Sequence, residues 1–392
     1  MINLNDGNIY IARAAGIALG YLGLSGAQGT INQYAGIFQA TVGPLSIVRG
    51  GYNLHGGTLY VAGVESVGNG STGTFVQDGA STSTFVNGLN VGISGGTGTY
   101  SLLSGSLLGW QLNSATTPPF FSINVGAAGS TGTFLMGNAA GTGTIGETGT
   151  GTRQVGLVIR ADSAASGTFR GWGTVGLGGA LINNGVIIAD GYGTDRSLDL
   201  SSISGPNLAG TSTFANTANN GWFARNHGKL LLPRLSITAD GAYSWGGAAF
   251  QNLVNNVQMV LHSVTTGDGN FAVSLLSPDR ADVPAGLVNP IGVWQFTPTT
   301  LQFGTVDLTF RYDAAAAAAL SVDPNTLGLF HYNGASWDLV GGTTNDTTND
   351  LLSATGLTSF SDYAVAQVPE PASLALLALG GVAALLRRRR AA

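Results

Sequence analysis

Short runs in which apolar and polar residues alternate recur along the first 234 residues. Thr58-Leu59-Tyr60-Val61 and Gly88-Leu89-Asn90-Val91 are two such runs, and glycine or asparagine separates one run from the next. Alternation with a period of two is typical of strands that bury one face, and glycine and asparagine supply the positive φ of tight corners. The pattern predicts many short β-strands joined by abrupt turns.

The predicted strands fall into repeating units. Several units contain a Val-Gly pair and, some residues later, a Gly-Thr pair before a large apolar residue, as in Val67-Gly68 with Gly73-Thr74-Phe75. The large apolar residue recurs 21 to 25 residues apart and later about 35 apart, at Ile31, Tyr52, Phe75, Tyr100, Phe134 and Phe169. Periods of this length are typical of stacked repeats.

One such unit cannot bury its apolar face alone, so the units must stack. We therefore predict a parallel β-solenoid, or β-helix, over residues 1–234, with loop insertions where the spacing grows. Residues 220–233 are expected to form a last, atypical rung. The units resemble the β-helical repeats of bacterial autotransporter passengers and related surface proteins. The alternative is a disordered linker rich in glycine and serine, which needs no recurring phase.

Residues 235–367 show alternating segments with more aromatic residues. Asn333-Gly334 marks one turn, and Trp245, Trp294 and Trp337 supply large core side chains. This pattern predicts an antiparallel β-sandwich, with Ala314–Ala319 as one short helical turn. The expected strands lie at residues 256–264, 271–276, 306–312, 327–332, 336–340 and 363–366.

The last 25 residues combine three features in order. Val368-Pro369-Glu370-Pro371 comes first, an apolar run follows to Leu386, and Arg387-Arg388-Arg389-Arg390 comes after it. The prolines keep the backbone around the glutamate extended and open to a peptidase. A helix satisfies the backbone of the apolar run in lipid, and the arginines stay on the cytoplasmic side. We therefore expect the chain before Val368 to lie outside the cytoplasmic membrane.

The apolar run, predicted as a transmembrane segment over residues 372–386, is short. Its 15 residues span roughly 22 Å as a helix at about 1.5 Å per residue, against a hydrocarbon core of about 30 Å. Residues 368–392 resemble the PEP-CTERM sorting signal of bacterial surface proteins. The resemblance implies recognition by exosortase, a membrane cysteine peptidase, and removal of the tail in transit. The alternative is an ordinary tail anchor with an accidental Pro-Glu-Pro.

These segments together predict an all-β chain, in which a parallel β-solenoid is followed by an antiparallel β-sandwich and a C-terminal transmembrane sorting helix. The sandwich is expected over residues 235–367, and it is similar to the membrane-proximal sandwich that often precedes PEP-CTERM tails. The sorting signal is expected over residues 368–392.

Composition narrows the classes of function. The chain has 62 glycines, no cysteine and 9% charged residues, and its one lysine is Lys229. The lack of cysteine excludes disulfides and thiolate metal sites. The net charge is −5, or about −9 without the four arginines, which argues against nucleic acid as a partner. Residues 1–30 lack the basic and apolar order of an export leader, so we expect an incomplete start of the chain.

Candidate chemical groups are sparse. Asp190, Asp195 and Asp199 are candidates for calcium binding or acid–base work, but we favour a solvated capping loop with an Asp–Arg pair. A second candidate for weak calcium binding, for which we favour a solvated turn, is the region that contains Asp338, Asn345, Asp346, Asn349 and Asp350.

The remaining motifs point to structure rather than to chemistry. Residues 68–73 and 141–146 match a dinucleotide fingerprint and residues 92–96 a nucleophile elbow, but no helix is predicted after them, so we expect solenoid corners. No metal-ligand spacing occurs among the four histidines, which are His55, His227, His262 and His331. His331 is expected to be a packed or edge residue of a strand.

We therefore expect a non-enzymatic protein with no catalytic residues, metal or cofactor, exported to the cell surface, outer envelope or extracellular matrix in a structural or adhesive role. Its expected partners are an exosortase-type membrane peptidase, the membrane and extracellular polysaccharide. The alternative is a carbohydrate-binding or polysaccharide-active β-helix. In that case Tyr52, Tyr60 and Trp110 would face outward and stack on sugars, whereas inward-facing rings would fill the core.

Overall fold

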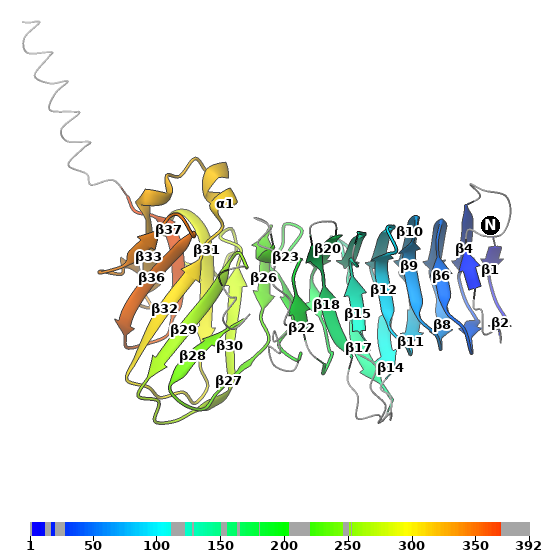
Figure 1. The fold of residues 1–392 in the computed structure, drawn as a ribbon, viewed down its shortest axis with the longest axis horizontal. Coiled ribbons are helices and arrows are strands. Elements are labelled where there is room, and N and C mark those ends of the chain that lie inside the picture. Colours follow the sequence, from blue (N-terminus) through cyan, green and yellow to red (C-terminus); the bar gives the residue numbers. More distant parts are fainter. Residues whose placement is uncertain are drawn as a thin grey trace, which may run out of the picture.

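Three parallel sheets wind along one axis and form a β-solenoid, which ends against a β-sandwich (Figure 1). This computed structural model describes residues 2–11, 17–19, 28–110, 122–127, 129–149, 155–162, 165–179, 181–203, 220–245, 251 and 253–369. Sheet A consists, in order, of β1 (Ile2–Leu4), β4 (Gly29–Gln33), β7 (Gly50–Leu54), β10 (Thr72–Gln77), β13 (Thr97–Leu102), β16 (Thr131–Met136), β20 (Ala165–Gly171), β23 (Val186–Asp190) and β25 (Gly221–Arg225), with β19 (Ala161–Asp162) beside β20.

Sheets B and C complete each rung. Sheet B contains β2 (Asn8–Ile11), β5 (Ile37–Ala40), β8 (Gly57–Val61), β11 (Ser81–Phe85), β14 (Ser106–Trp110) and β17 (Thr144–Thr148). Sheet C contains β3 (Ile17–Leu19), β6 (Leu45–Ile47), β9 (Glu65–Asn69), β12 (Leu89–Ile93), β15 (Ser122–Val125), β18 (Gly156–Ile159) and β22 (Leu181–Asn183). The predicted solenoid is confirmed, with three strands to a rung.

The large apolar residues of the repeat form one column inside sheet A. In the strand register Ile31 lies opposite Tyr52, and the column continues through Phe75, Tyr100, Phe134, Phe169, Ile187 and Trp222. The rings from Tyr52 to Phe169 stack with centroids 4.5 to 5.2 Å apart and planes within 8° of parallel. Strand spacing of about 4.8 Å sets this separation. The large apolar residues that recur in the sequence therefore form a stacked core.

Two tyrosines in this column have buried hydroxyl groups with a partner on the preceding rung. Tyr52 Oη donates to Gln33 Oε1 at 2.5 Å, and Tyr100 Oη donates to Gln77 Oε1 at 2.9 Å. Phe75, which has no hydroxyl, instead follows Leu54 on the rung before it. The sequence thus alternates tyrosine with phenylalanine where glutamine alternates with leucine, because a buried hydroxyl needs a partner.

The Val-Gly and Gly-Thr pairs of the repeat meet at one corner. A Cβ added to Gly98 would lie 2.1 Å from the Val67 carbonyl oxygen and 2.4 Å from the Gly92 nitrogen. Gly92 itself has φ +74°. One repeat further on, a Cβ added to Gly132 would lie 2.2 Å from the Gly126 nitrogen. Backbone approaches backbone here without room for a side chain, which explains the recurring glycines. Residues 68–73, 92–96 and 141–146 each contain a turn, at 70–71, 94–96 and 141–143, and each turn leads into a strand rather than a helix, as predicted.

The sandwich consists of two sheets. Sheet D begins with three parallel strands that continue the solenoid, β21 (Gly173–Thr174), β24 (Arg196–Asp199) and β26 (Gly228–Leu231). It goes on with the antiparallel strands β30 (Asp268–Leu276), β31 (Val288–Thr297), β37 (Asp362–Gln367), β33 (Leu327–Tyr332) and β34 (Trp337–Leu339), with β27 (Leu235–Ile237) beside β30. Sheet E contains β28 (Gly241–Ser244), β29 (Asn256–His262), β32 (Thr305–Arg311), β36 (Leu351–Leu357) and β35 (Thr344–Asp346). The predicted antiparallel pairing is confirmed.

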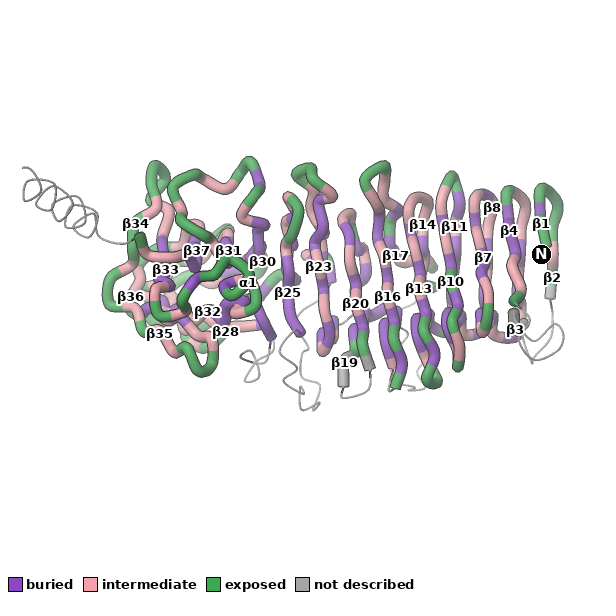
Figure 2. The backbone as a smooth tube through the Cα atoms, turned by 90° about the horizontal axis from the view of Figure 1, so that it is seen from above, coloured by how far each residue is buried: buried purple, intermediate pink, exposed green. Residues whose placement is uncertain are grey.

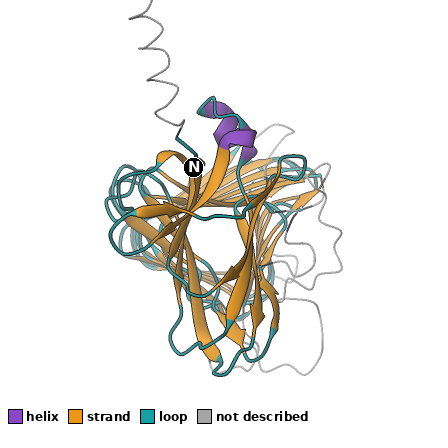
Figure 3. Ribbon diagram, turned by 90° about the vertical axis from the view of Figure 1, so that its left-hand side faces the viewer, coloured by secondary structure: helices purple, strands orange, loops and turns teal. Residues whose placement is uncertain are grey.

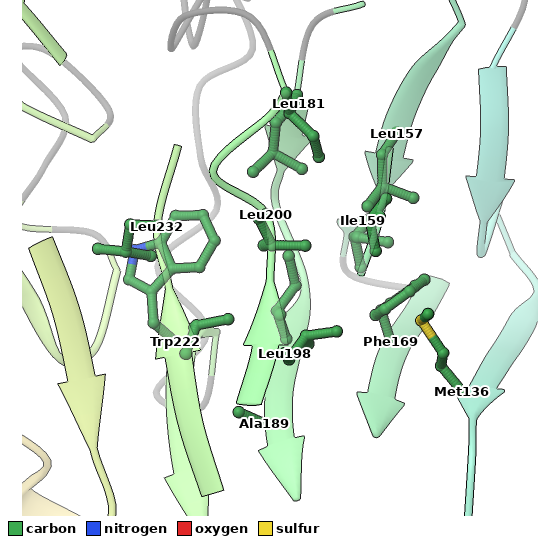
Figure 4. Close-up of a cluster of buried hydrophobic side chains, with 14 of the residues drawn as sticks. Met136, Leu157, Ile159, Phe169, Leu181, Ala189, Leu198, Leu200, Trp222 and Leu232 are labelled. Atoms are coloured by element: carbon green, nitrogen blue, oxygen red, sulfur yellow. The ribbon is translucent and has the colours of Figure 1, made fainter. Parts of the chain in front are cut away.

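Solenoid and sandwich share backbone hydrogen bonds and one core. A parallel bridge joins Ile145 of β17 to Val175, so sheet B leads into β21, β24 and β26, and β26 pairs antiparallel with β30. At this end Trp222, Leu198, Leu200 and Leu232 pack together between the last rungs (Figure 4). The boundary predicted at residue 234 falls between β26 and β27, which both pair with β30.

The inner faces of the strands are buried and the corners are exposed (Figure 2). Trp245 and Trp294 are fully buried in the sandwich, as predicted, and Trp337 is half-buried. The predicted helical turn is present as α1 (Ala314–Ala319), which the Asp313 side chain caps, and a 3-10 turn, η2 (Pro324–Thr326), follows it. Within the described ranges, no helix has the length and apolar character needed to cross a bilayer. The transmembrane segment predicted at 372–386 lies outside those ranges.

Candidate sorting site and other expected sites

The sorting signal begins where the sandwich ends. The last strand, β37, lies inside sheet D between β31 and β33. The N–H of Val368, the residue after this strand's Gln367, donates to the Thr326 carbonyl oxygen at 2.8 Å. The Val368 side chain packs against a small apolar cluster on the outside of sheet D, made of Leu276, Val293, Phe330, Ala364 and Ala366. The first residue of the signal is therefore fixed to the folded body.

Glycine makes room for this attachment. A Cβ added to Gly328 would lie 2.6 Å from Val368 Cγ2 and 2.8 Å from Leu339 Cδ1. Val368 and Leu339 thus cover the same position on β33. Pro369 is the last described residue, and the other predicted signal residues lie outside the described part of the chain, namely Glu370, Pro371, Arg387, Arg388, Arg389 and Arg390.

The three aspartates expected near the solenoid cap have separate partners. Asp190 accepts from Arg170 Nε at 2.7 Å, Asp195 from His227 Nδ1 at 3.0 Å, and Asp199 from the Ser201 backbone N–H at 2.8 Å. Burial alone would raise the pKa of Asp190, but the bonds to its carboxylate lower this pKa overall. The expected Asp–Arg pair is thus present as Asp190 with Arg170, but Asp190 is buried at the end of β23, so the expectation of a solvated loop is wrong for this residue. Across the described ranges, no group of three acidic or histidine side chains gathers as a metal ligand set.

In the second acidic region, Asp338 and Asp346 accept hydrogen bonds from residues of their own turns. Asp346 accepts from the backbone N–H groups of Thr348 and Asn349 at 3.0 and 3.2 Å, and Asp338 accepts from Asn333 Nδ2 at 2.7 Å. A hydrogen bond from the Asn349 side chain lowers the pKa of Asp346 most, and the two backbone bonds lower it further. These contacts are those of capped turns.

Three histidines lie beside aspartates, His227 beside both Asp195 and Asp279, and the fourth packs on an aromatic ring. His55 lies 2.8 Å from Asp78, and His262 lies 3.1 Å from Asp307. The His331 ring lies 4.8 Å from the Tyr363 ring, and burial lowers the pKa of His331. The expectation of a packed strand residue is confirmed for His331.

The structure corrects one of the aromatic residues proposed to stack on sugars. Tyr52 is fully buried in the core column, so the outward position considered for it is wrong. Tyr60 is half-buried, Trp110 is 38% exposed, and their rings meet edge to face at 6.3 Å on the outside of sheet B. Two of the three aromatics therefore remain accessible.

Sequence reasoning missed a buried carboxyl group. Glu65 is fully buried inside the solenoid, and neither of its oxygens has a hydrogen-bond partner among the described residues. Burial raises the pKa of Glu65 to about 8. The signal was available, because Glu65 occupies a column of sheet C otherwise filled by leucine and isoleucine, as at Leu45 and Leu89.

A cleft of about 690 Å³ lies where the last rung meets the sandwich. Phe223, Arg225 and Asn226 line it from the solenoid, and Asn289 and Ala316 line it from the sandwich. The Arg225 guanidinium stacks 4.9 Å from the centroid of the Phe223 ring. Asp279 and Asp313 also line it, so the cleft combines an apolar wall with one exposed cation, amide groups and two carboxyl groups.

The comparisons with known proteins bear on the C-terminal segment. Residues 367–390 match the family described as the PEP-CTERM protein-sorting motif. No curated protein and no solved structure matches the chain. The match begins at Gln367, the last residue of β37, so motif and fold meet without a linker between them. The chain is an exported protein that carries a PEP-CTERM sorting signal, and its signal directs it to exosortase.

Proposed function

We propose that the chain is a structural or adhesive protein of the cell surface or extracellular matrix, without enzymatic activity, and that exosortase removes its tail near Pro369. The observation that carries this proposal is the continuous buried core from Leu4 to Val365, which makes solenoid and sandwich one body. From β1 to β25 sheet A rises by eight steps of about 4.8 Å, roughly 38 Å of rod. A rod that is attached to the cell at one end can present its side faces to the surrounding matrix.

The outer face of sheet A supports the adhesive role. Thr72, Thr97 and Thr131 lie side by side in the register, and a second row contains Thr74, Thr99, Thr133 and Thr168. Neighbouring hydroxyls repeat at the strand spacing of about 4.8 Å. Uncharged donors and acceptors in rows suit contact with neutral, hydroxyl-rich polymers.

Surface display tests the proposal. Replacing Pro369, Glu370 and Pro371 together by alanine should leave uncleaved protein in the membrane fraction, because exosortase then lacks its motif. Replacing Arg387 to Arg390 by alanine should impair membrane orientation. Normal display and processing of both variants would contradict the proposal. Turnover of an extracellular polysaccharide by the purified wild type would contradict its non-enzymatic part.

The cleft favours a second candidate, a carbohydrate-binding protein. Amide groups, carboxyl groups and a guanidinium beside an aromatic ring are a combination that binds the hydroxyl groups of neutral sugars. A glycan array with wild type and Arg225→Ala tests it, and Arg234→Ala is the matched control, because Arg234 lies on the sandwich outside the cleft. Binding of neutral glycans that Arg225→Ala abolishes and Arg234→Ala leaves unchanged would favour this candidate.

A further inference from the structure

Exposed apolar side chains gather where the sandwich gives way to the sorting signal. Among the described residues of the sandwich, the exposed large hydrophobic side chains are Val288 (41% exposed), Leu320 (46%) and Leu339 (52%). Val288 lies opposite Gln367 in the register of β31 and β37. Leu339 shares its position over Gly328 with Val368. Two of the three therefore lie next to the point where the chain leaves the body.

Leu320 belongs to the same end of the sandwich. It follows α1 directly and lines the cleft together with Asn289, the neighbour of Val288. Viewed along the solenoid axis, α1 stands out from the strands on the side where the described chain ends (Figure 3). We call Val288, Leu320, Leu339 and the exposed alanines of α1 the exit surface.

Helix α1 has an unusual composition for an exposed element. All six of its residues are alanine, Ala317 alone is buried, and its first and last turns contain no charged residue. Ala315, Ala318 and Ala319 are exposed. A helix on the surface of a soluble body normally turns charged residues to water, so an apolar outer side indicates a non-aqueous neighbour.

The length of the chain limits how far the exit surface can lie from lipid. Val368 is fixed to Thr326, and three residues separate it from the apolar run that begins at Ala372. The four Cα–Cα steps from Val368 to Ala372 reach at most about 14 Å at about 3.6 Å each. The headgroup layer on each side of the hydrocarbon core is roughly 5 to 7 Å thick. The body therefore lies within about 10 Å of the headgroup layer while the run is in the bilayer.

We propose that the exit surface rests in the interfacial layer of the bilayer before processing, with Leu320 and Leu339 in contact with lipid. This inference rests on the proposed membrane-attached stage of the sorting signal. Asp313 and Asp323 cap α1 and η2, and the exposed Asp338 precedes Leu339. Asp279 and Arg225 line the cleft with Leu320, so acidic groups outnumber the one cation near the exit surface. Contact is therefore apolar, and it does not depend on anionic lipid.

Depth-dependent fluorescence quenching tests the inference on the full-length chain, which contains no cysteine. Single-cysteine variants Leu320→Cys and Leu339→Cys carry an environment-sensitive dye, in phosphatidylcholine vesicles that contain nitroxide-labelled lipid. Tyr10→Cys is the matched control, since Tyr10 is 59% exposed and lies in the first rung, at the opposite end of the solenoid (Figure 1). Ala372→Cys reports insertion of the apolar run.

We expect several-fold stronger quenching at Leu320 and Leu339 than at Tyr10, unchanged when anionic lipid or salt is added. If Ala372→Cys is quenched but Leu320→Cys and Leu339→Cys are quenched no more than Tyr10→Cys, the inference is overturned. Membrane attachment through the apolar run would then still hold. No quenching at Ala372 would overturn attachment, and the inference with it. Quenching that appears only after exosortase is added would assign the exit surface to that enzyme and overturn the lipid contact.

Discussion

Glu65 places a carboxyl group inside the solenoid, level with Leu45 and Leu89 of the neighbouring rungs. Its burial raises its own pKa to about 8, from an ordinary value of 4.5. Burial and the charge of Glu65 together raise the pKa of the Tyr100 hydroxyl. The folded chain therefore prefers a neutral Glu65, and ionisation acts against the packing of the rung.

The first prediction concerns pH. A folded pKa above the unfolded one means that the contribution of Glu65 to stability is fully present below pH 4.5 and is lost as pH rises to about 8. At about 1.4 kcal/mol per pH unit the loss is on the order of a few kcal/mol. Glu65→Gln should therefore be more stable than wild type at pH 8, in urea unfolding followed by circular dichroism.

The exposed residue Asp6 provides the control for this prediction. Asp6→Asn should leave the difference in unfolding free energy between pH 5 and pH 8 unchanged. Equal pH dependence of wild type and Glu65→Gln would show that Glu65 does not titrate inside the fold.

Glycine at the repeat corner gives a second prediction. Gly98→Ala places a Cβ 2.1 Å from the Val67 carbonyl oxygen, so backbone must move. Overpacking of this kind costs about 1–3 kcal/mol. Gly341→Ala is the control, because no atom lies within 4 Å of its added Cβ. Thermal unfolding should show a lowered Tm for Gly98→Ala alone, and equal Tm values would contradict the crowded corner.

For single residues, the sequence correctly predicted the glycines and large apolar residues that recur in every unit. It missed residues that differ from the other units at the same position. Tyr52 stands in the column of Ile31 and Phe75, so strict alignment of the units places it inside, although a single tyrosine looks equally suited to a surface. Glu65 needed the same alignment in sheet C. The residues next to it in the sequence, Val64 and Ser66, give no indication that Glu65 is buried.

The strand is the element that carries the stacked core. Five rings from Tyr52 to Phe169 come from five successive strands of sheet A, and each ring contacts the next. A solenoid is stabilised mainly by contacts between neighbouring rungs. Loss of one ring therefore breaks two contacts at once.

A third prediction tests this column. Phe75→Ala should lower the free energy of unfolding by about 3–5 kcal/mol, the usual cost of removing a buried phenyl ring. Val76→Ala on the same strand is the control, because Val76 is half-buried on the outer side of sheet A. Chemical denaturation measures both. A loss for Phe75→Ala no greater than that for Val76→Ala would mean that the rings do not stabilise the stack.

Element positions in the sandwich were less readable than those in the solenoid. The six segments expected as strands and the alanine helix were predicted correctly, because each is a local pattern, but β31 and β36 were missed. The place of β37 inside sheet D, between β31 and β33, was not predictable, since pairing between distant segments has no local signature. The exit surface could not be inferred from sequence for the same reason.

In the whole molecule, solenoid and sandwich are joined by strand pairing rather than by a linker. Lys229, in β26, donates to Gln295 of β31 at 2.6 Å, and Arg280 donates to the carbonyl oxygens of Arg196 and His227 at 3.0 and 2.8 Å. These bonds add to the backbone ladder between β26 and β30.

The fourth prediction is one cooperative unfolding transition. Because the two parts share a sheet and a core, their signals should change together. Fluorescence of Trp294 reports the sandwich once the other tryptophans are replaced by phenylalanine, and Trp222 retained alone reports the last rung. Two separate midpoints in guanidinium chloride would contradict the shared core.

The central claim is that the chain is exported and processed at its C-terminal signal. Mass spectrometry of the C-terminus of surface-localised protein tests it most directly. We predict that residues 374–392 are absent and that the last retained residue lies close to Pro369, beside the end of β37. A surface-localised chain with its terminal arginines intact would contradict processing by exosortase.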